Sequence, residues 1–472
     1  MLIPPGGYPF AVLAHATVVL AGLLIYAVGT HLSGQRRHPS AALAWVLTIA
    51  LLPYVGLPLY LVLGTRKFAR PPLLSAQSIH LADGTLRGSA MTTLEGMGLA
   101  PPAANRAICF HRDGAVAWEE FEKLTRSASS QLDICTYLLG NDIVGHQLVR
   151  LLQSRAAAGV RVRLLLDALG CWRTPSAQVR ELRRAGVEVR WHMPLLRNLL
   201  SGRGNLRNHR KLTIADGQRL WSGGRNLAVE YFTGDGHSAP WTDLSFTIDG
   251  PLAAQAQMLF DSHWVYSHGP GTPDRLPAKL QPMRQTESAK SAAAQHLAQM
   301  VPSGPDQGQD TFYGLLLTAL FRAEKSVLAV TPYFVPDEAL LTALCLAARR
   351  GVRVELVVPA RSNHRLADLA RARALRDLAA AGGQIRLAAG MVHAKALVID
   401  DAIGLCGSLN LDSRSLFLNF ELMVAFYDTR DIAEVTKWMA ENFGALQSFA
   451  PRQASLTSDI AEGLVRWLGF QI

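Results

Sequence analysis

The sequence predicts an α/β protein in which two similar halves share one active site, preceded by a transmembrane helical hairpin. First, a polar motif, H-x-K-x4-D-x6-G-[GS]-x-N, occurs twice, beginning at His209 and at His393. Second, strand-like and helix-like segments alternate in the same order before each copy, which predicts sheets with helices on their faces. Third, two long apolar runs open the chain.

The apolar runs, residues 10–32 and 41–63, contain no Asp, Glu, Lys or Arg, and only eight residues separate them. Each run is about long enough to cross the roughly 30 Å of bilayer hydrocarbon as a helix. We therefore predict a hairpin over residues 1–64. A cleaved signal peptide is disfavoured because no Lys or Arg precedes the first run. Core helices of a soluble domain are disfavoured because neither run has a charged face.

The basic residues around the hairpin favour one orientation slightly. Two arginines lie in the turn between the runs, and Arg66, Lys67 and Arg70 follow the second run. Because basic residues accumulate on the cytoplasmic side, this count leans toward a cytoplasmic body.

After the hairpin we expect a tether over 65–105, a first half over 106–267, a linker or lid over 268–309 and a second half over 310–472. Hydrophobic periodicity and turn residues set the elements. In the first half these are strands at 131–137, 159–167 and 187–190, and helices at 145–158 and 177–185. In the second half they are strands at 326–333, 351–358 and 384–387, and helices at 337–350 and 365–381.

The two motifs supply the candidate catalytic groups. If residues 208–214 form a strand, alternation places His209 and Lys211 on one face, and the same holds for His393 and Lys395. Facing each other, the halves would surround one phosphate with two imidazoles and two ammonium groups. The lysines would stabilise the negative charge that grows during phosphoryl transfer.

Other residues of the motifs support this site. Gly224 and Ser408 allow close approach of the backbone, and Asn226 and Asn410 add amide donors. The acids of the motifs, Asp216 and Asp400, are candidate catalytic residues, although a structural role in the turn at the strand end is equally open.

Composition restricts partners and cofactors. The net charge of +10 favours an anionic partner, either nucleic acid or an acidic membrane surface. The five cysteines are scattered and never spaced C-x-x-C, which argues against a disulfide framework or a zinc site. Each motif offers one good metal ligand, its histidine, so we expect neither metal nor cofactor.

With these residues in place, the chain resembles the phospholipase D superfamily, and within it the bacterial cardiolipin synthases. The likeness rests on both H-x-K-x4-D motifs, on the text at 207–211, 223–226, 331–337, 390–395 and 410–421, and on the hairpin text at 44–64. It covers nearly the whole chain. It implies two phospholipase D-like halves in a protein that its hairpin anchors in the bacterial inner membrane.

The resemblance also implies a mechanism. His209 would attack phosphorus to give a covalent phosphatidyl-histidine, and His393 would serve as general acid and base. Asp243 would orient His209, and Glu421 would orient His393. The phosphatidyl group of one phosphatidylglycerol would pass to another, releasing glycerol. Two coupled histidines predict a bell-shaped pH profile that belongs to the pair.

Rival functions remain open at this stage. Hydrolysis by a phospholipase D would release phosphatidic acid. Asn363 stands where relatives carry aspartate, so phosphatidylethanolamine is an alternative donor. A nucleic-acid enzyme is permitted by the charge but disfavoured by the hairpin. A catalytically silent scaffold is disfavoured by the two complete His–Lys pairs.

Overall fold

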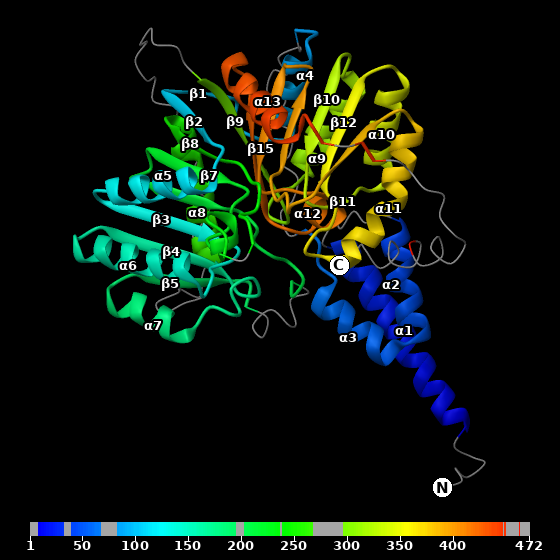
Figure 1. Ribbon diagram of the computed structural model, residues 1–472. Helices are drawn as coiled ribbons and strands as arrows, with labels where there is room; N and C mark the ends of the chain where they lie inside the picture. The colour runs from blue at the N-terminus through cyan, green and yellow to red at the C-terminus, as the bar shows by residue number, and fades with distance from the viewer. Residues whose placement is uncertain are drawn as a thin grey trace.

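The computed structural model describes residues 8–32, 39–67, 83–194, 203–236, 238–267, 296–446, 448–449 and 462. Two β-sheets lie side by side, each with helices on its outer face, and a group of N-terminal helices extends from one end of the body (Figure 1). The predicted mixed α/β architecture with two similar halves is confirmed.

The first half is a seven-stranded sheet in the order β2-β8-β7-β6-β3-β4-β5. Parallel pairing joins β3, β4 and β5, and antiparallel pairing joins the others. The strands are β2 (Ala107–His111), β3 (Gln131–Thr136), β4 (Arg161–Asp167), β5 (Glu188–His192), β6 (Leu212–Ala215), β7 (Arg219–Gly223) and β8 (Ser245–Asp249). The helices are α5 (Gly114–Ser127), α6 (Ile143–Ala157), α7 (Ser176–Arg184), the 3-10 turn η1 (Val229–Tyr231) and α8 (Pro251–Tyr266).

The second half repeats this order as β9-β17-β15-β14-β10-β12-β13 and adds β1 beyond β9. Its strands are β1 (Ala103–Asn105), β9 (His296–Ser303), β10 (Ser326–Val330), β12 (Arg353–Pro359), β13 (Gln384–Ala388), β14 (Ala396–Ile399), β15 (Ile403–Gly407) and β17 (Glu421–Phe426). Its helices are α9 (Thr311–Arg322), α10 (Glu338–Arg349), α11 (Arg365–Ala380), α12 (Ser413–Phe417) and α13 (Thr429–Phe443). A small pair, β11 (Phe334–Val335) and β16 (Leu411–Asp412), lies beside this sheet.

An apolar core joins the two halves. One cluster of buried side chains draws on both sheets, on α8 and on α13. Phe426 of β17 meets Phe110 of β2 and Phe246 of β8 with ring centroids 5.0 Å and 5.4 Å apart. Because this shared core is built from both sheets, it fixes one half relative to the other.

Two segment boundaries in the structure differ from the expected ones. The tether over 65–105 contains α4 (Leu86–Gly96), whose buried Ala90 and Leu94 join the core of the second half. It also contains β1, which pairs with β9. Strand β9 itself lies within the expected linker over 268–309. Residues 68–82 and 268–295 of these two segments lie outside the described residues.

The N-terminal helices depart from a simple two-span hairpin. Helix α1 (Tyr8–Leu32) is the single described helix long and apolar enough to span a membrane by length and composition, over Val12–His31. The sequence predicts one helix over 41–63, but the structure has α2 (Pro39–Leu51) and α3 (Pro53–Leu63). The break falls at Leu52, at φ −132° and ψ 59°, because proline disfavours a helical conformation in the residue before it.

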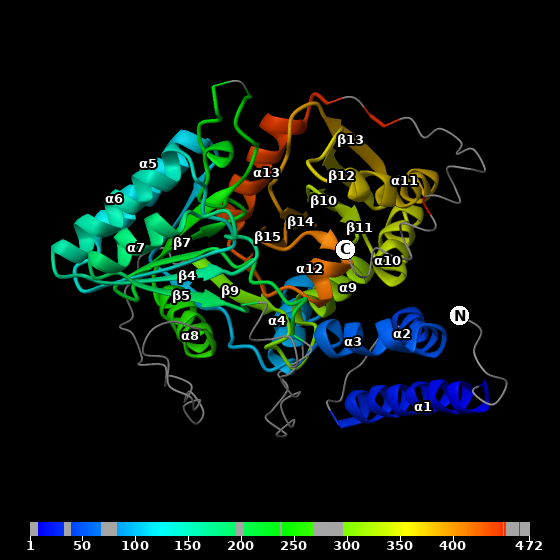
Figure 2. The ribbon, with the colours of Figure 1, turned by 90° about the horizontal axis from the view of Figure 1, so that it is seen from below.

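The three helices pack into one unit. Helix α1 lies beside α2 and α3, and both views show the group beside α12 (Figure 2). Buried Tyr26, Trp45, Ile49 and Tyr60 form the seam. The outer faces carry exposed apolar side chains, including Leu20 at 68% and Leu24 at 64% exposure. A surface of this kind is suited to lipid.

Candidate active site

Each His–Lys pair lies just before a strand and is held by the opposite half. Strands β6 and β14 begin only at Leu212 and Ala396, so the expected strand from 208 is too long by several residues. Instead, Asn208 forms an isolated β-bridge with Phe420, and Val392 forms one with Thr242.

The same cross-half contacts include the histidine backbones. The His209 N–H donates to the Phe420 carbonyl at 2.9 Å, and the His393 N–H donates to the Thr242 carbonyl at 2.8 Å. Two equivalent contacts therefore bring the motifs together between the halves.

In the second motif the histidine is tightly bound. Its Nδ1 lies 2.7 Å from Oδ2 of Asp243, and both residues are buried. The Lys395 Nζ lies 2.9 Å from Nδ1 and 3.0 Å from Nε2 of His393, and it donates to the His393 carbonyl. Asp243 therefore fixes the orientation of this ring.

In the first motif the histidine is held more loosely. The Nδ1 of His209 lies 3.7 Å from Oε1 of Glu421, which is beyond hydrogen-bond distance. Its ring lies against Tyr137, with centroids 3.8 Å apart. Lys211 Nζ donates to the His209 carbonyl at 2.6 Å. The His209 side chain is 21% exposed against 10% for His393, so it is the more accessible ring.

The acids are exchanged relative to the prediction. Asp243, expected beside His209, binds His393, and Glu421, expected beside His393, lies near His209. The reason is the bridging described above: Phe420 precedes Glu421 and pairs with the first motif, whereas Thr242 precedes Asp243 and pairs with the second. Each half thus supplies the acid of the other.

Gly224 and Ser408 lie against these two acids. A Cβ on Gly224 would lie 2.2 Å from Oδ1 of Asp243, so a side chain there would displace the carboxylate. At the equivalent place in the second half, the Ser408 hydroxyl donates to Oε2 of Glu421 at 2.5 Å. Asn419 Nδ2 adds a contact at 3.3 Å to Oε1 of Glu421.

The two motif asparagines are buried in matching environments. Asn226 Nδ2 donates to the Tyr231 hydroxyl at 2.8 Å, and Asn410 Nδ2 donates to the Ser415 hydroxyl at 3.2 Å. The Oδ1 atoms of Asn226 and Asn410 have no hydrogen-bond partner among the described residues. The Tyr231 ring also contacts His393, with centroids 4.9 Å apart.

Asp216 and Asp400, the candidate catalytic acids, are turn residues at the other end of β6 and β14. Asp216 accepts the backbone N–H groups of residues 129–131 at 2.8–2.9 Å, together with two serine hydroxyls. Asp400 accepts the N–H groups of residues 324–326 at 2.7–2.8 Å. Both have φ of +53°, which aspartate tolerates better than most residues. These hydrogen bonds hold the segments that lead into β3 and β10.

Burial dominates the electrostatics of the histidines. The pKa of His393 is lowered to about 4, chiefly by burial and then by the charge of Lys395, while Asp243 opposes the change. Burial, followed by the charges of Lys211, Arg414 and Lys395, lowers the pKa of His209 well below its usual value. Lys395 of the second half therefore acts electrostatically on His209 of the first.

The lysines and acids of the site are also perturbed. Burial lowers the pKa of Lys211 and brings that of Lys395 to about 7. Burial raises the pKa of Glu421 to about 7, although Lys211 opposes this change. Burial also acts to raise the pKa of Asp243, but the hydrogen bond and charge of His393 outweigh it and lower the pKa. A phosphate anion bound here would favour the charged form of both lysines.

The neighbours of the histidines that are missing from the sequence-based site include Tyr137, Tyr231 and Arg414. Tyr137 ends the segment predicted as the first strand, and Tyr333 stands near the corresponding place in the second half. Arg414 lies in the 410–421 text that carries the family likeness, but nothing in its spacing assigns it a role. Its guanidinium donates to the side chain and carbonyl of Asn205, both at 2.8 Å.

Asn363, the departure from the family pattern, accepts a hydrogen bond of 2.5 Å from the Tyr333 hydroxyl. The pKa of Tyr333 is raised, chiefly by burial and then by nearby Asp412. Asp412 ends β16, which directly follows Asn410, so Asn363 is connected to the edge of the site through Tyr333.

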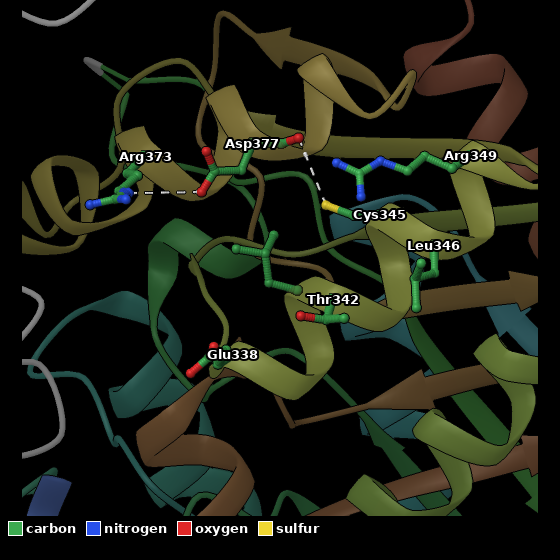
Figure 3. Close-up of a pocket in the computed structure, with 8 residues that line it drawn as sticks. Glu338, Thr342, Cys345, Leu346, Arg349, Arg373 and Asp377 are labelled. Carbon is green, nitrogen blue, oxygen red and sulfur yellow. Dashed lines mark hydrogen bonds and ion pairs between the residues drawn. The ribbon is translucent and has the colours of Figure 1, made fainter.

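A separate pocket lies on the outer face of the second half, between α10 and α11 (Figure 3). Its walls include Glu338, Cys345, Arg349, Arg373 and Asp377. Arg373 pairs with Asp377 at 3.9 Å across one side. No residue of the duplicated motifs lines this pocket.

Comparison with known families identifies both halves. The family model described as "Cardiolipin synthase, PLD-like domain" matches residues 122–264 and 316–446. A second model, described as "Phospholipase_D-nuclease N-terminal", matches residues 22–64. The first model alone covers more than half of the chain.

Two relatives agree with this assignment, and one solved structure shares the fold. Cardiolipin synthase A of Pseudomonas putida is 30% identical over 90% of this chain and 91% of its own length. Cardiolipin synthase of Geobacillus kaustophilus is 30% identical over 92% of this chain and 87% of its own. The crystal structure of phosphatidylserine synthase from Haemophilus influenzae shares the fold, with a TM-score of 0.63, 14% identity, and coverage of 82% of this chain and all of that one. The chain belongs to the cardiolipin synthase family of phospholipase D-like proteins.

Proposed function

We propose that this protein is a cardiolipin synthase that transfers a phosphatidyl group from one phosphatidylglycerol to another and releases glycerol. The observation that carries the proposal is the pairing of two His–Lys motifs in one buried site, each beside an acid of the opposite half. Relatives named cardiolipin synthase that align over about nine-tenths of the chain support the same reaction.

His209 is the proposed nucleophile. Its ring is the more exposed of the two, and burial together with Lys211 keeps it unprotonated. A ring nitrogen attacks phosphorus and forms a P–N bond as the P–O bond to the departing glycerol breaks. Lys211 and Lys395 stabilise the charge on the non-bridging oxygens.

His393 is the proposed general acid and base. Asp243 holds its Nδ1 and, together with the bound phosphate anion, favours the protonated ring, whose Nε2 gives a proton to the departing glycerol oxygen. The hydroxyl of the second phosphatidylglycerol then returns a proton to Nε2 and attacks phosphorus, and the P–N bond to His209 breaks. One phosphodiester replaces another, so the reaction consumes no nucleotide.

The N-terminal helices would hold this site at the lipid surface. We propose that α1 crosses the bacterial inner membrane, that α2 and α3 form the second arm, and that the body lies on the cytoplasmic side. Two contacts support a fixed site near the membrane: the Gly204 N–H donates to the Val62 carbonyl at 2.9 Å, and Arg66 lies 4.7 Å from the Phe417 ring centroid.

The proposal is tested by incubating purified full-length protein in detergent with phosphatidylglycerol alone. Cardiolipin and glycerol should form in equal amounts. Phosphatidic acid as the sole lipid product would assign a phospholipase D instead. Adding labelled phosphatidylethanolamine tests the alternative donor, because label in cardiolipin would show that its phosphatidyl group is used.

A further inference from the structure

A loop of the second half binds the end of the N-terminal helices. We call residues 304–310 the anchor loop. Lys67, which follows α3, donates from Nζ to the carbonyls of Gly304, Gln307 and Gln309 at 3.0–3.1 Å, and lies 3.1 Å from Oδ1 of Asp310. Its side chain is 14% exposed. Four oxygens around one nearly buried ammonium partly offset its loss of hydration.

The other side of the anchor loop binds the residue between the catalytic His209 and Lys211. This residue, Arg210, is 1% exposed. Its two terminal nitrogens bind both oxygens of Asp306 at 2.8 Å and 3.0 Å. Its Nε donates to the carbonyl of Glu421 at 2.9 Å, and NH2 donates to the Ser303 carbonyl at 3.0 Å.

The anchor loop also packs on the backbone that holds His209. Gly304 has φ of +143°, and a Cβ there would lie 2.9 Å from the Cα of Phe420. The Phe420 carbonyl accepts the N–H of His209, and Glu421 follows directly. The chain of contacts from Lys67 to the His209–Glu421 pair is therefore continuous.

We propose that Lys67 and Asp306 are positioning residues of the active site. The anchor loop lies between them. Through Arg210, it fixes the pair of His209 and Glu421 relative to the end of the N-terminal helices at Lys67. This inference rests on the proposed function. Because the two halves meet at His209, a displacement of about 1 Å there can cost about 100-fold in rate.

The test measures kcat and KM for phosphatidylglycerol in the full-length protein with Lys67→Met or Asp306→Asn. We expect kcat to fall about 10-fold or more while KM stays within about 3-fold, because neither side chain contacts the reacting lipid. Asp306→Glu restores the charge and should recover part of kcat.

Matched controls use ion pairs elsewhere. Lys437→Met removes the exposed partner of Glu441, and Asp261→Asn removes one partner of Arg163, which keeps Asp133. Both should leave kcat unchanged.

The double variant Lys67→Met/Asp306→Asn decides between a shared path and two separate stabilising contacts. If both residues act through the anchor loop, the loss in kcat should be clearly smaller than the product of the single losses. Multiplicative losses, an unchanged kcat, or losses that match the unfolded fraction in a melting curve would overturn the inference.

The inference and the proposed function fail in different ways. If the wild type makes no cardiolipin from phosphatidylglycerol, the proposed function fails. The same kcat comparison on a phosphatidyl p-nitrophenyl ester then still decides whether Lys67 and Asp306 position His209.

Discussion

At the scale of single residues, the duplicated motif predicts the chemical groups but not all of their partners. Two copies of His-x-Lys at equal spacing in a repeated sequence indicate a shared site, and the structure brings both pairs together. The exchange of Asp243 and Glu421 depends on how the halves dock, which no local pattern records. Asp216 and Asp400 share the motif because each half needs the same turn, so repetition alone cannot separate chemistry from folding.

Asp216→Asn should lower stability and leave chemistry intact. The Asp216 carboxylate accepts three backbone N–H groups, which lower its pKa against the effect of burial. We expect a loss of about 1–3 kcal/mol in the free energy of unfolding at pH 7. Because the folded-state pKa is depressed, this contribution is present above about pH 4 and is lost as the pH falls further.

Denaturant titrations of both proteins at pH 7 and pH 3 measure this difference, and kcat of the folded fraction should equal that of the wild type. A large loss of kcat without loss of stability would return Asp216 to the catalytic group.

Replacing each acid by its amide should distinguish the roles of the two histidines. Asp243→Asn removes the charge that holds His393, so we expect kcat with phosphatidylglycerol to fall about 10²- to 10⁴-fold. With a p-nitrophenyl ester, whose leaving group requires no proton, the first step should be nearly unaffected. Glu421→Gln should slow that first step, because Glu421 lies beside His209. Stopped-flow absorbance of nitrophenol distinguishes the two, and equal effects would contradict the exchanged pairing.

At the scale of elements, strands and helices with a regular apolar period can be predicted from the sequence, whereas isolated short elements cannot. The strands and helices that the sequence predicts for both halves lie within a few residues of their positions in the structure, because each has a clear apolar pattern. The break at Leu52 is missed because apolar composition hides the effect of Pro53 on the preceding residue. Helix α4 and strand β1 are missed because they are short and gain their stability from the second half.

Leu94→Ala tests the assignment of α4 to the body. The Leu94 side chain is fully buried against the second half, so its truncation should cost about 2–5 kcal/mol of unfolding free energy. Leu366→Ala is the control, since Leu366 is 51% exposed. Chemical denaturation of the two variants gives the comparison, and equal stability would mean that α4 is only a tether.

At the scale of the whole molecule, two duplicated units make one site because each completes the other. The sequence predicts the duplication, since the same order of elements precedes each motif. It does not predict the shared core that fixes the docking, because Phe110, Phe246 and Phe426 come from strands far apart in the chain. The side of the membrane on which the body lies is also a property of the whole molecule.

Cys109 reports the side of the membrane on which the body lies. It is exposed on β2, whereas the other four cysteines are buried. We expect a membrane-impermeant maleimide to label the protein only after spheroplasts are opened, and Cys109→Ser to abolish the label. Labelling of intact spheroplasts would place the body outside the cytoplasm.

The central claim is that His209 and His393 act on one phosphorus atom in two successive steps. It is tested most directly by a burst experiment with the phosphatidyl p-nitrophenyl ester. His393→Ala should release about one nitrophenol per enzyme and then stop, with the phosphatidyl group on His209 detected by mass spectrometry of the peptide. His209→Ala should give no burst. A full burst from His209→Ala, or a phosphatidyl group on another residue, would contradict the account.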